Sequence, residues 1–141
     1  MLRATGAAVL LVLVVGGLAG CQSSGNATLQ VGDCVSLEPS DNGDKTVRVD
    51  CAQPHNQEVF YSFAMPNGDF PGYFEIGDAA QDECTSAFED YVGVPWEQSD
   101  YTYDFAAPDE ETWAQGERTI TCLLEDASGE RLTGSARGTA R

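Results

Sequence analysis

The chain has 141 residues, of which 23 are acidic and seven are basic, so its formal net charge at pH 7 is −16. So acidic a surface repels phosphate backbones and anionic lipid headgroups, which excludes nucleic acid as a partner. The length is that of a single domain.

The first 20 residues have the pattern of a secretory signal peptide that is removed from the mature protein. Arg3 supplies a positive charge, and residues 7–15 form an unbroken apolar run. This run is shorter than the roughly 20 residues that a membrane-spanning helix needs. The signal ends in LAGC at 18–21, the pattern of a lipobox, in which Cys21 is lipidated and cleavage occurs just before it.

The sequence therefore predicts an exported protein that is held at the extracytoplasmic face of the cell membrane by acyl chains on Cys21, such as palmitate. Residues 21–29 are expected to be the lipidated cysteine and a polar tether. One domain should follow over residues 30–137, and residues 138–141 are expected to be a frayed tail.

The domain should begin with a β-hairpin. Residues 29–37 alternate loosely and predict a strand, and the DNGD sequence at 41–44 is typical of a turn because Asn-Gly accepts positive φ. Residues 46–50 then alternate as a half-buried strand does. The acidic residues of the turn lack the spacing of an EF-hand loop, so we interpret them as turn residues and not as a calcium site.

A third strand is expected over 58–64, and one amphipathic helix over 78–92. Asp78 and Gln81 resemble a capping box at the start of this helix, and Gly93 is a fitting stop. Its apolar residues fall on one face at spacings of three and four, namely Ala80, Cys84, Ala87, Phe88 and Tyr91.

The rest of the chain favours β-structure. Residues 96–108 predict a strand or an extended loop, in which Tyr101, Tyr103 and Phe105 alternate. Residues 118–124 predict a clear strand, 126–129 a turn, and 131–136 a returning hairpin partner. The fold class is therefore α+β, a small antiparallel sheet of about five strands with one packed helix.

Four cysteines remain besides Cys21, and they are Cys34, Cys51, Cys84 and Cys122. An even number in an exported chain indicates two disulfides, with three connectivities to choose from. A Cys34–Cys51 bridge would close the hairpin, and Cys84 could join the helix to a strand. None of the four lies in a C-x-x-C pair, and the chain has one histidine, so we expect no metal site.

The residues resemble a known family. VGDCV at 31–35 and VDCAQPHNQEV at 49–59 are similar to the opening of the septum formation domain family of actinobacterial envelope proteins. The second half is similar to it in Cys84, Pro108, Trp113, Gly116, Arg118, Cys122 and LTGS at 132–135. The resemblance implies the pairing Cys34–Cys51 and Cys84–Cys122 and a location near the division septum, and it implies no enzymatic activity.

His55 and Glu58 are the first candidates for a functional site. A His–Glu dyad could provide a base or a metal ligand, and a hydrolase using His55 would follow from it. Catalysis also needs a nucleophile and charge-stabilising groups, which the sequence does not nominate. We favour the structural interpretation, in which His55 fixes a turn after Cys51, and we expect no catalytic residue and no cofactor.

Arg118 and Trp113 are the second candidates. Arg118 could clamp a carboxylate ligand, but stacking on Trp113 or pairing with a nearby acid is the favoured interpretation. Tyr101, Tyr103 and Phe105 could line a groove for a partner peptide, which is a weaker hypothesis.

The function that the sequence favours is a non-catalytic, membrane-anchored interaction module of the cell envelope, with an envelope protein as its partner and a link to septum formation or wall assembly. The alternative is a binding protein for a small envelope ligand or metal cation, using His55, Glu58 and neighbouring acids.

Overall fold

The computed structural model describes residues 28–41 and 43–141. The signal peptide, Cys21 and most of the expected tether lie outside the described residues. Among the residues that are described, no helix has the length and apolar character needed to cross a membrane.

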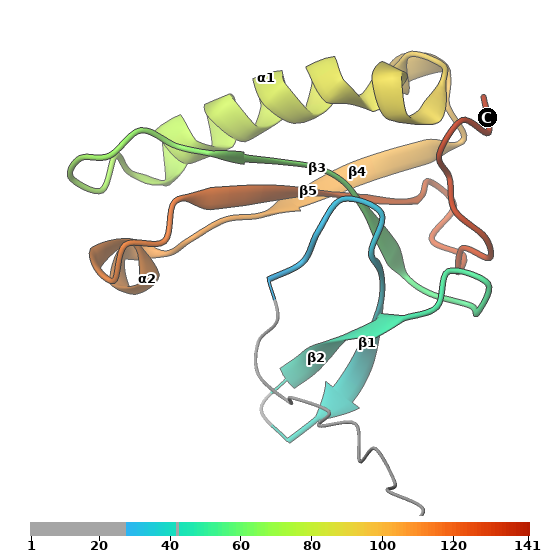
Figure 1. Cartoon of the computed structure of the whole chain (residues 1–141), viewed down its shortest axis with the longest axis horizontal. Helices are drawn as coiled ribbons and strands as arrows, with labels where there is room; N and C mark the ends of the chain where they lie inside the picture. The colour runs from blue at the N-terminus through green and yellow to red at the C-terminus, as the bar shows by residue number, and fades with distance from the viewer. Residues whose placement is uncertain (1–27, 42) are drawn as a thin grey trace, which may run out of the picture.

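Five antiparallel strands form one sheet in the order β2-β1-β3-β5-β4, and the long helix α1 lies across one face of it (Figure 1). This confirms the expected α+β class. The strands are β1 (Cys34–Ser40), β2 (Gly43–Val49), β3 (Gln57–Ala64), β4 (Tyr101–Ala106) and β5 (Thr119–Asp126).

The N-terminal hairpin forms as expected, although both of its strands have different bounds. β1 and β2 pair from Cys34 opposite Val49 to Ser40 opposite Gly43. The first strand begins at Cys34 and not at residue 29, because residues 31–32 form a turn in which Gly32 adopts a φ of 95°. Gly43 has a φ of 104°, as the turn requires. Asn42 of the predicted turn lies outside the described residues.

Helix α1 (Tyr73–Val92) begins earlier than the predicted start at residue 78. Its N-cap is Gly72, which makes no side-chain cap hydrogen bond, so the expected capping box at Asp78 lies inside the helix. Gly93 ends the helix in the left-handed conformation, as expected. The early start was hidden because Tyr73 and Phe74 are exposed, so they do not extend the apolar stripe.

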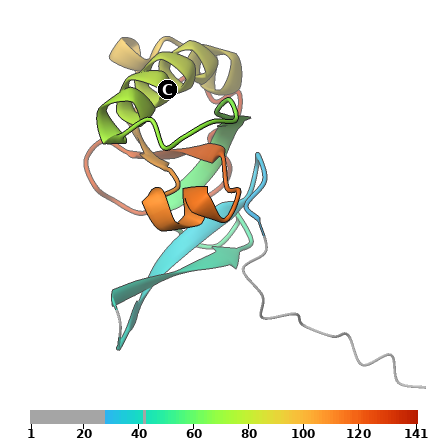
Figure 2. The ribbon, with the colours of Figure 1, turned by 90° about the vertical axis from the view of Figure 1, so that its left-hand side faces the viewer.

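The core lies between α1 and the sheet, with α1 above the strands in Figures 1 and 2. Phe60 of β3 sits at its centre, with its ring centroid 5.6 Å from that of Phe88 and 5.9 Å from that of Tyr103. A second group joins Ile76 and Ala80 of α1 to Trp113 and Ile120. Trp113 belongs to a short helix that the sequence analysis missed, α2 (Glu110–Ala114), whose N-cap Asp109 accepts a hydrogen bond from the Thr112 amide.

Both disulfides have the pairing that the family resemblance implies. Cys34 and Cys51 have Cα atoms 5.2 Å apart, and those of Cys84 and Cys122 are 5.7 Å apart. The first bridge closes the N-terminal hairpin against the loop that follows it. The second joins α1 to β5 through two side chains that are fully buried in the core.

The C-terminal segment departs from the prediction in two ways. Residues 131–136 do not form a hairpin strand: their one bridge in the described chain joins Leu132 to His55. The tail is not frayed, because the amides of Gly138 and Ala140 donate to the carbonyls of Tyr91 and Val92. The segment therefore runs along the end of α1 instead of returning along β5.

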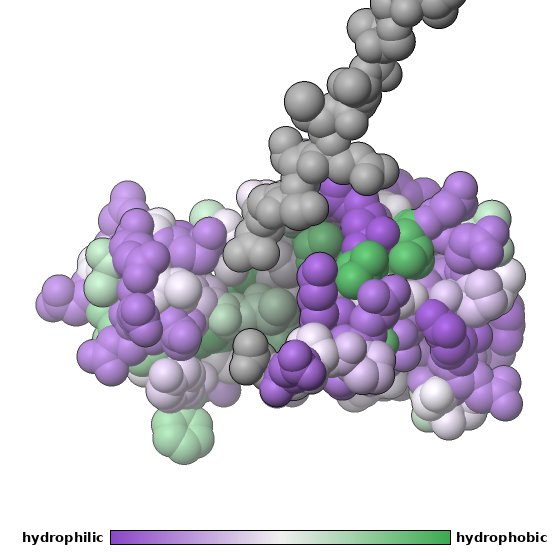
Figure 3. Space-filling view, turned by 90° about the horizontal axis from the view of Figure 1, so that it is seen from below, coloured by the Kyte–Doolittle hydropathy of each residue, from purple (hydrophilic) through white to green (hydrophobic). Residues whose placement is uncertain are grey.

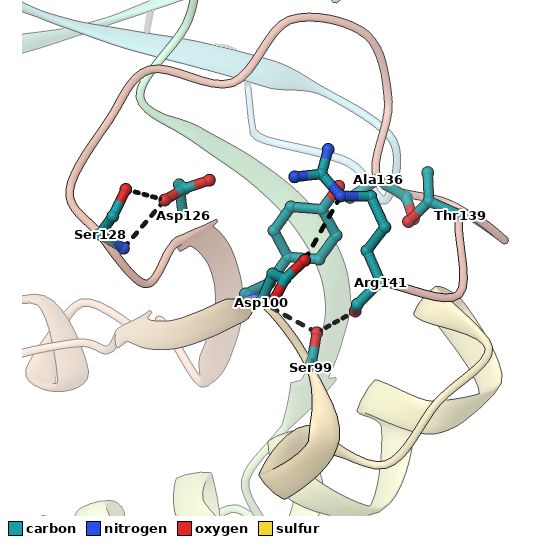
Figure 4. Close-up of polar contacts among 8 residues, drawn as sticks. Ser99, Asp100, Asp126, Ser128, Ala136, Thr139 and Arg141 are labelled. Carbon is teal, nitrogen blue, oxygen red and sulfur yellow. Dashed lines mark hydrogen bonds and ion pairs between the residues drawn. The ribbon is translucent and has the colours of Figure 1, made fainter.

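The last residue is also held (Figure 4). The carbonyl oxygen of Arg141 accepts a hydrogen bond from the Ser99 hydroxyl, and its guanidinium lies 3.6 Å from the Asp100 carboxylate. Ser99 follows the short 3-10 turn η1 (Trp96–Gln98), where the sequence predicted only a strand or loop. These contacts tie residues 136–141 to α1 and to the start of β4.

The two disulfides should contribute unequally to stability. Replacing Cys84 and Cys122 by alanine should lower the free energy of unfolding by about 0.7 kcal/mol more than replacing Cys34 and Cys51. The reason is that the Cys84–Cys122 bridge closes a loop of 38 residues, whereas the Cys34–Cys51 bridge closes one of 17. Cys84 and Cys122 are both fully buried whereas Cys51 is half-buried, which increases the difference. Urea denaturation of the two double variants measures this, and equal or reversed losses would contradict it.

Candidate functional site

His55 lies in the loop between β2 and β3, where it is fully buried. Its backbone exchanges two hydrogen bonds with Leu132, at 3.0 and 2.8 Å. The ring nitrogen Nδ1 lies 2.8 Å from the carbonyl oxygen of Gln53, two residues earlier, so the imidazole closes its own turn. Nε2 is buried and has no hydrogen-bond partner among the described residues. This is the geometry of the structural interpretation, in which His55 fixes the turn after Cys51.

Glu58 is the most heavily bonded side chain of this region, and it is also fully buried. Its Oε1 accepts hydrogen bonds from the Tyr91 hydroxyl and the Ser135 hydroxyl, both at 2.5 Å. Its Oε2 accepts a hydrogen bond from the Ala136 amide at 2.7 Å. The carboxylate of β3 thereby holds both the end of α1 and the C-terminal segment.

Tyr91 connects this carboxylate to the helix. Burial, and then the hydrogen bond to Glu58, raise the pKa of Tyr91 to about 12. Both causes favour the protonated phenol, which is the form that donates to the carboxylate. Arg137 covers the ring, with its guanidinium carbon 4.4 Å from the ring centroid.

His55 and Glu58 therefore do not form the dyad that a hydrolase would need. In the described chain, His55 bonds to its own loop, while both oxygens of Glu58 serve Tyr91, Ser135 and Ala136. Both side chains are inaccessible to a substrate. The Glu58 carboxylate does lie within 4.8 Å of the sulfurs of Cys34 and Cys51, but these sulfurs are joined in a disulfide. A cysteine binds a metal ion as its thiolate, which a disulfide does not offer.

Arg118 and Trp113 lie together at the other end of the sheet, away from His55. The guanidinium carbon of Arg118 is 4.0 Å from the Trp113 ring centroid, and Nη1 donates to the carbonyl oxygens of Trp113 and Glu117 at 2.7 Å. The indole N–H of Trp113 donates to the carbonyl oxygen of Gly68. Arg118 thus stacks on Trp113 and holds the α2–β5 connection, as the favoured interpretation has it.

The alternating aromatic residues of β4 are committed to the core. Tyr101 is 5% exposed, and Tyr103 and Phe105 are half-buried and pack against the core clusters. Tyr101 is also covered by Arg141, whose guanidinium carbon is 5.5 Å from the ring centroid. This packing does not favour the weaker hypothesis, in which these three side chains line a groove for a partner peptide.

The two most exposed aromatic residues of the described chain lie elsewhere, at the start of α1. Phe74 is 94% exposed and Tyr73 is 66% exposed, although both are large hydrophobic residues. The ring of Phe70 contacts Tyr73 on one side and Trp113 on the other, at centroid distances of 5.1 and 5.8 Å. We call Phe70, Tyr73 and Phe74 the aromatic end. The sequence signal for it was available, in two aromatic residues directly after Pro-Gly and off the helical stripe.

Acidic residues are frequent in the segments next to the aromatic end. The exposed acids of the nearby segments are Asp69, Glu75, Asp78, Glu110, Glu111 and Glu117. Hydrogen bonds from Thr119 and from the Arg118 amide hold the pKa of the Glu117 carboxyl below its usual value, so it is charged at neutral pH. An open hollow of about 400 Å³ lies beside it, lined by Thr112, Gln115, Gly116 and Glu117.

The fold and its bonded interior define a small α+β domain with two disulfides, in which a buried carboxylate braces the C-terminal segment. A family model described as Septum formation matches residues 31–141, and the chain belongs to the septum formation family. This confirms the family resemblance of the sequence.

Two curated relatives are similar over most of the chain, and both are named "Putative lipoprotein LppN". The protein of Mycobacterium tuberculosis (strain ATCC 25618 / H37Rv) is 35% identical over 114 residues, and that of Mycobacterium bovis (strain ATCC BAA-935 / AF2122/97) is 32% identical. The match covers 77% of this chain and 62% of each relative, so the chain spans less than two thirds of their length. No solved structure matches the chain.

Replacing Glu58 by glutamine should weaken the hold on the C-terminal segment. Oε1 accepts from two hydroxyls, and an amide nitrogen in its place can only donate, so the charge-assisted bonds are lost. We expect the free energy of unfolding to fall by about 1–3 kcal/mol, and amide exchange over residues 132–140 to accelerate. The matched control is Glu130→Gln, at an exposed position, with a change within about 0.5 kcal/mol. Equal effects would contradict the role of Glu58.

Tyr91 should make stability fall at alkaline pH. Its folded pKa of about 12 lies above the ordinary pKa of a tyrosine, 10.0, so the folded state favours the protonated phenol. The resulting stabilisation is complete below pH 10 and is lost as the pH rises toward 12. Free energies of unfolding measured across this range should decline more steeply for the wild type than for Tyr91→Phe. Parallel curves would show that Tyr91 does not titrate in this way.

Proposed function

We propose that this protein is a lipid-anchored envelope protein that acts without catalysis, by binding a partner protein in septum formation or wall assembly. The LAGC sequence ending at Cys21 supports the anchor, and the two relatives carry the word lipoprotein in their names. The family description supports the process. Residues 1–27, which include the anchoring cysteine, lie outside the described structure.

The observation that carries the interaction role is the aromatic end. The side chain of Phe74 is 94% exposed and stays in water, so it adds no hydrophobic stabilisation to the fold. Phe74 directly follows Tyr73 and precedes Glu75, so an exposed hydrophobic side chain lies next to an acidic one. Aromatic anchors of this kind supply much of the binding energy of protein interfaces when a pocket on the partner receives them.

The binding surface expected on the partner follows from Phe74 and the acidic residues next to it. It should present an apolar pocket for Phe74, with basic residues around its rim that face the acids of α1 and α2. The long-range attraction between an acidic domain and a basic rim speeds association at low ionic strength. Anchoring the domain on the membrane by a short tether would confine the search to partners at the same surface.

The alternative of catalysis receives no support from the positions of the candidate residues. His55 and Glu58 are fully buried, and Arg118 lies at the opposite end of the sheet. A base, an acid and a charge-stabilising group must converge on one accessible place to act on a substrate.

The test is photo-crosslinking from the aromatic end in living cells. A photoreactive phenylalanine analogue at position 74 of the full chain should give one discrete adduct with an envelope protein, and the same analogue at Ser86 of α1 should not. Adding Cys21→Ser should abolish the adduct, because the protein then leaves the membrane.

A substitution separates this function from folding. Phe74→Ala should change the free energy of unfolding by less than about 0.5 kcal/mol, since the side chain is exposed, yet it should weaken partner binding about tenfold or more. The adduct must be identified, and its partner must carry an apolar pocket with a basic rim. Equal crosslinking from positions 74 and 86, or full binding by Phe74→Ala, would overturn the proposal.

A further inference from the structure

The β1–β2 hairpin extends beyond the body of the domain, as both ribbon views show (Figures 1 and 2). β1 pairs with β3 only at Cys34 and Val35, so the remainder of the hairpin is a two-stranded ribbon. Its residues from Leu37 onward are exposed except Val47 and Val49, which are half-buried. Seen from the hairpin side, the surface is mostly hydrophilic, with a limited hydrophobic area (Figure 3). The ribbon therefore has two outer edges, one formed by β1 and one by β2.

The edge formed by β1 is closed to further strands. The carbonyl oxygen of Val35 accepts from the Asn56 amide, and the Leu37 amide donates to the side-chain oxygen of Asn56. The next residue that faces this way is Pro39, which has no N–H to donate. The outer edge β4 is also blunted at Phe105, because its amide donates to the side chain of Asp104.

The edge formed by β2 is open. Residues directly opposite each other in an antiparallel pair either both face each other or both face away. Val35 and Leu37 face away from β2, so their partners Arg48 and Thr46 face away from β1, and Asp44, opposite Pro39, does the same. The sheet order ends at β2, so within the described chain no strand receives these three N–H and C=O groups.

This open edge is complementary to itself. If two copies of β2 pair antiparallel about a two-fold axis at Thr46, Asp44 of each copy lies opposite Arg48 of the other. All three outward-facing residues then fall in hydrogen-bonded positions, and two pairs of opposite charge form on one face. Arg48 already lies 2.7 Å from Asp33, and its guanidinium retains further donors for the second carboxylate.

The other symmetric registers are less favourable. An axis at Asp44, Lys45 or Arg48 places like charges directly opposite each other, and an axis at Val47 places Asp44 opposite Asp50. Like charges directly opposite on neighbouring strands are destabilising. The charge pattern of residues 44–50 therefore selects one register.

We propose that two copies of this chain associate through β2, edge to edge in the register centred on Thr46, to form one continuous sheet across the dimer. The contact is one short strand, smaller than the roughly 1,200 Å² of a stable interface, so the association is weak in solution. Confinement of both copies to one membrane, which rests on the proposed function, raises their effective concentration and favours the pair.

The test uses single cysteines in the full, membrane-anchored chain. Thr46→Cys places its Cα atom about 5.5 Å from that of its symmetry mate, within reach of a disulfide. Lys45→Cys is the matched control, because it lies on the opposite face of the strand and farther from its mate. The four cysteines of the described domain are already paired, so each variant adds one free thiol to them.

Oxidation should give a covalent dimer of Thr46→Cys at a yield about tenfold above that of Lys45→Cys. Adding Asp44→Arg should lower the Thr46→Cys yield about tenfold, since two attractive pairs become repulsive, and exchanging the two charges with Asp44→Arg and Arg48→Asp should restore it. Equal yields from positions 45 and 46, or no effect of Asp44→Arg, would overturn this register. A dimer that forms without the membrane anchor supports the edge contact even if the anchoring role fails.

Discussion

The carboxylate of Glu58 joins three parts of the fold. It projects from β3, accepts a hydrogen bond from Tyr91 at the end of α1, and accepts two more from residues 135–136. A buried carboxylate is costly unless its oxygens are bonded, and here both are. The role of Glu58 is therefore to fix the place where the C-terminal segment crosses the end of α1.

The position of that segment explains why the histidine has no accessible role. Once residues 132–136 are held over the end of β3, Leu132 pairs with the backbone of His55 and covers the loop that carries it. Two residues of the PHNQE sequence at 54–58 thus stabilise this region: His55 closes its own turn, and Glu58 accepts hydrogen bonds from the C-terminal segment. The two residues that suggest a catalytic pair in the sequence make structural hydrogen bonds to different segments.

Much of the fold could be predicted because it rests on local patterns. The apolar residues of β3, the alternation along β5 and the apolar stripe of α1 are short-range signals, and each specified its element, with errors at the ends. The disulfide pairing came from the family resemblance. The C-terminal segment could not be predicted, because its course depends on Glu58, about 78 residues away in the chain. The turn at 126–129 led to the prediction that residues 131–136 return as a hairpin strand.

The candidate site was harder to predict than the fold, for a related reason. Sequence patterns identify residues with reactive side chains, and so they nominated His55 and Arg118 as candidates. The structural interpretation was favoured for both, and the structure engages both side chains internally. The proposed binding surfaces are instead marked by groups that the fold leaves unused, such as Phe74 and the open edge of β2. The aromatic pair at 73–74 is visible in the sequence, but only the structure establishes its exposure. The aromatic end belongs to the helix layer and the β2 edge to the projecting hairpin (Figure 2). Pairing through the hairpin would therefore leave both aromatic ends free, so that a dimer on the membrane could bind two partners at once.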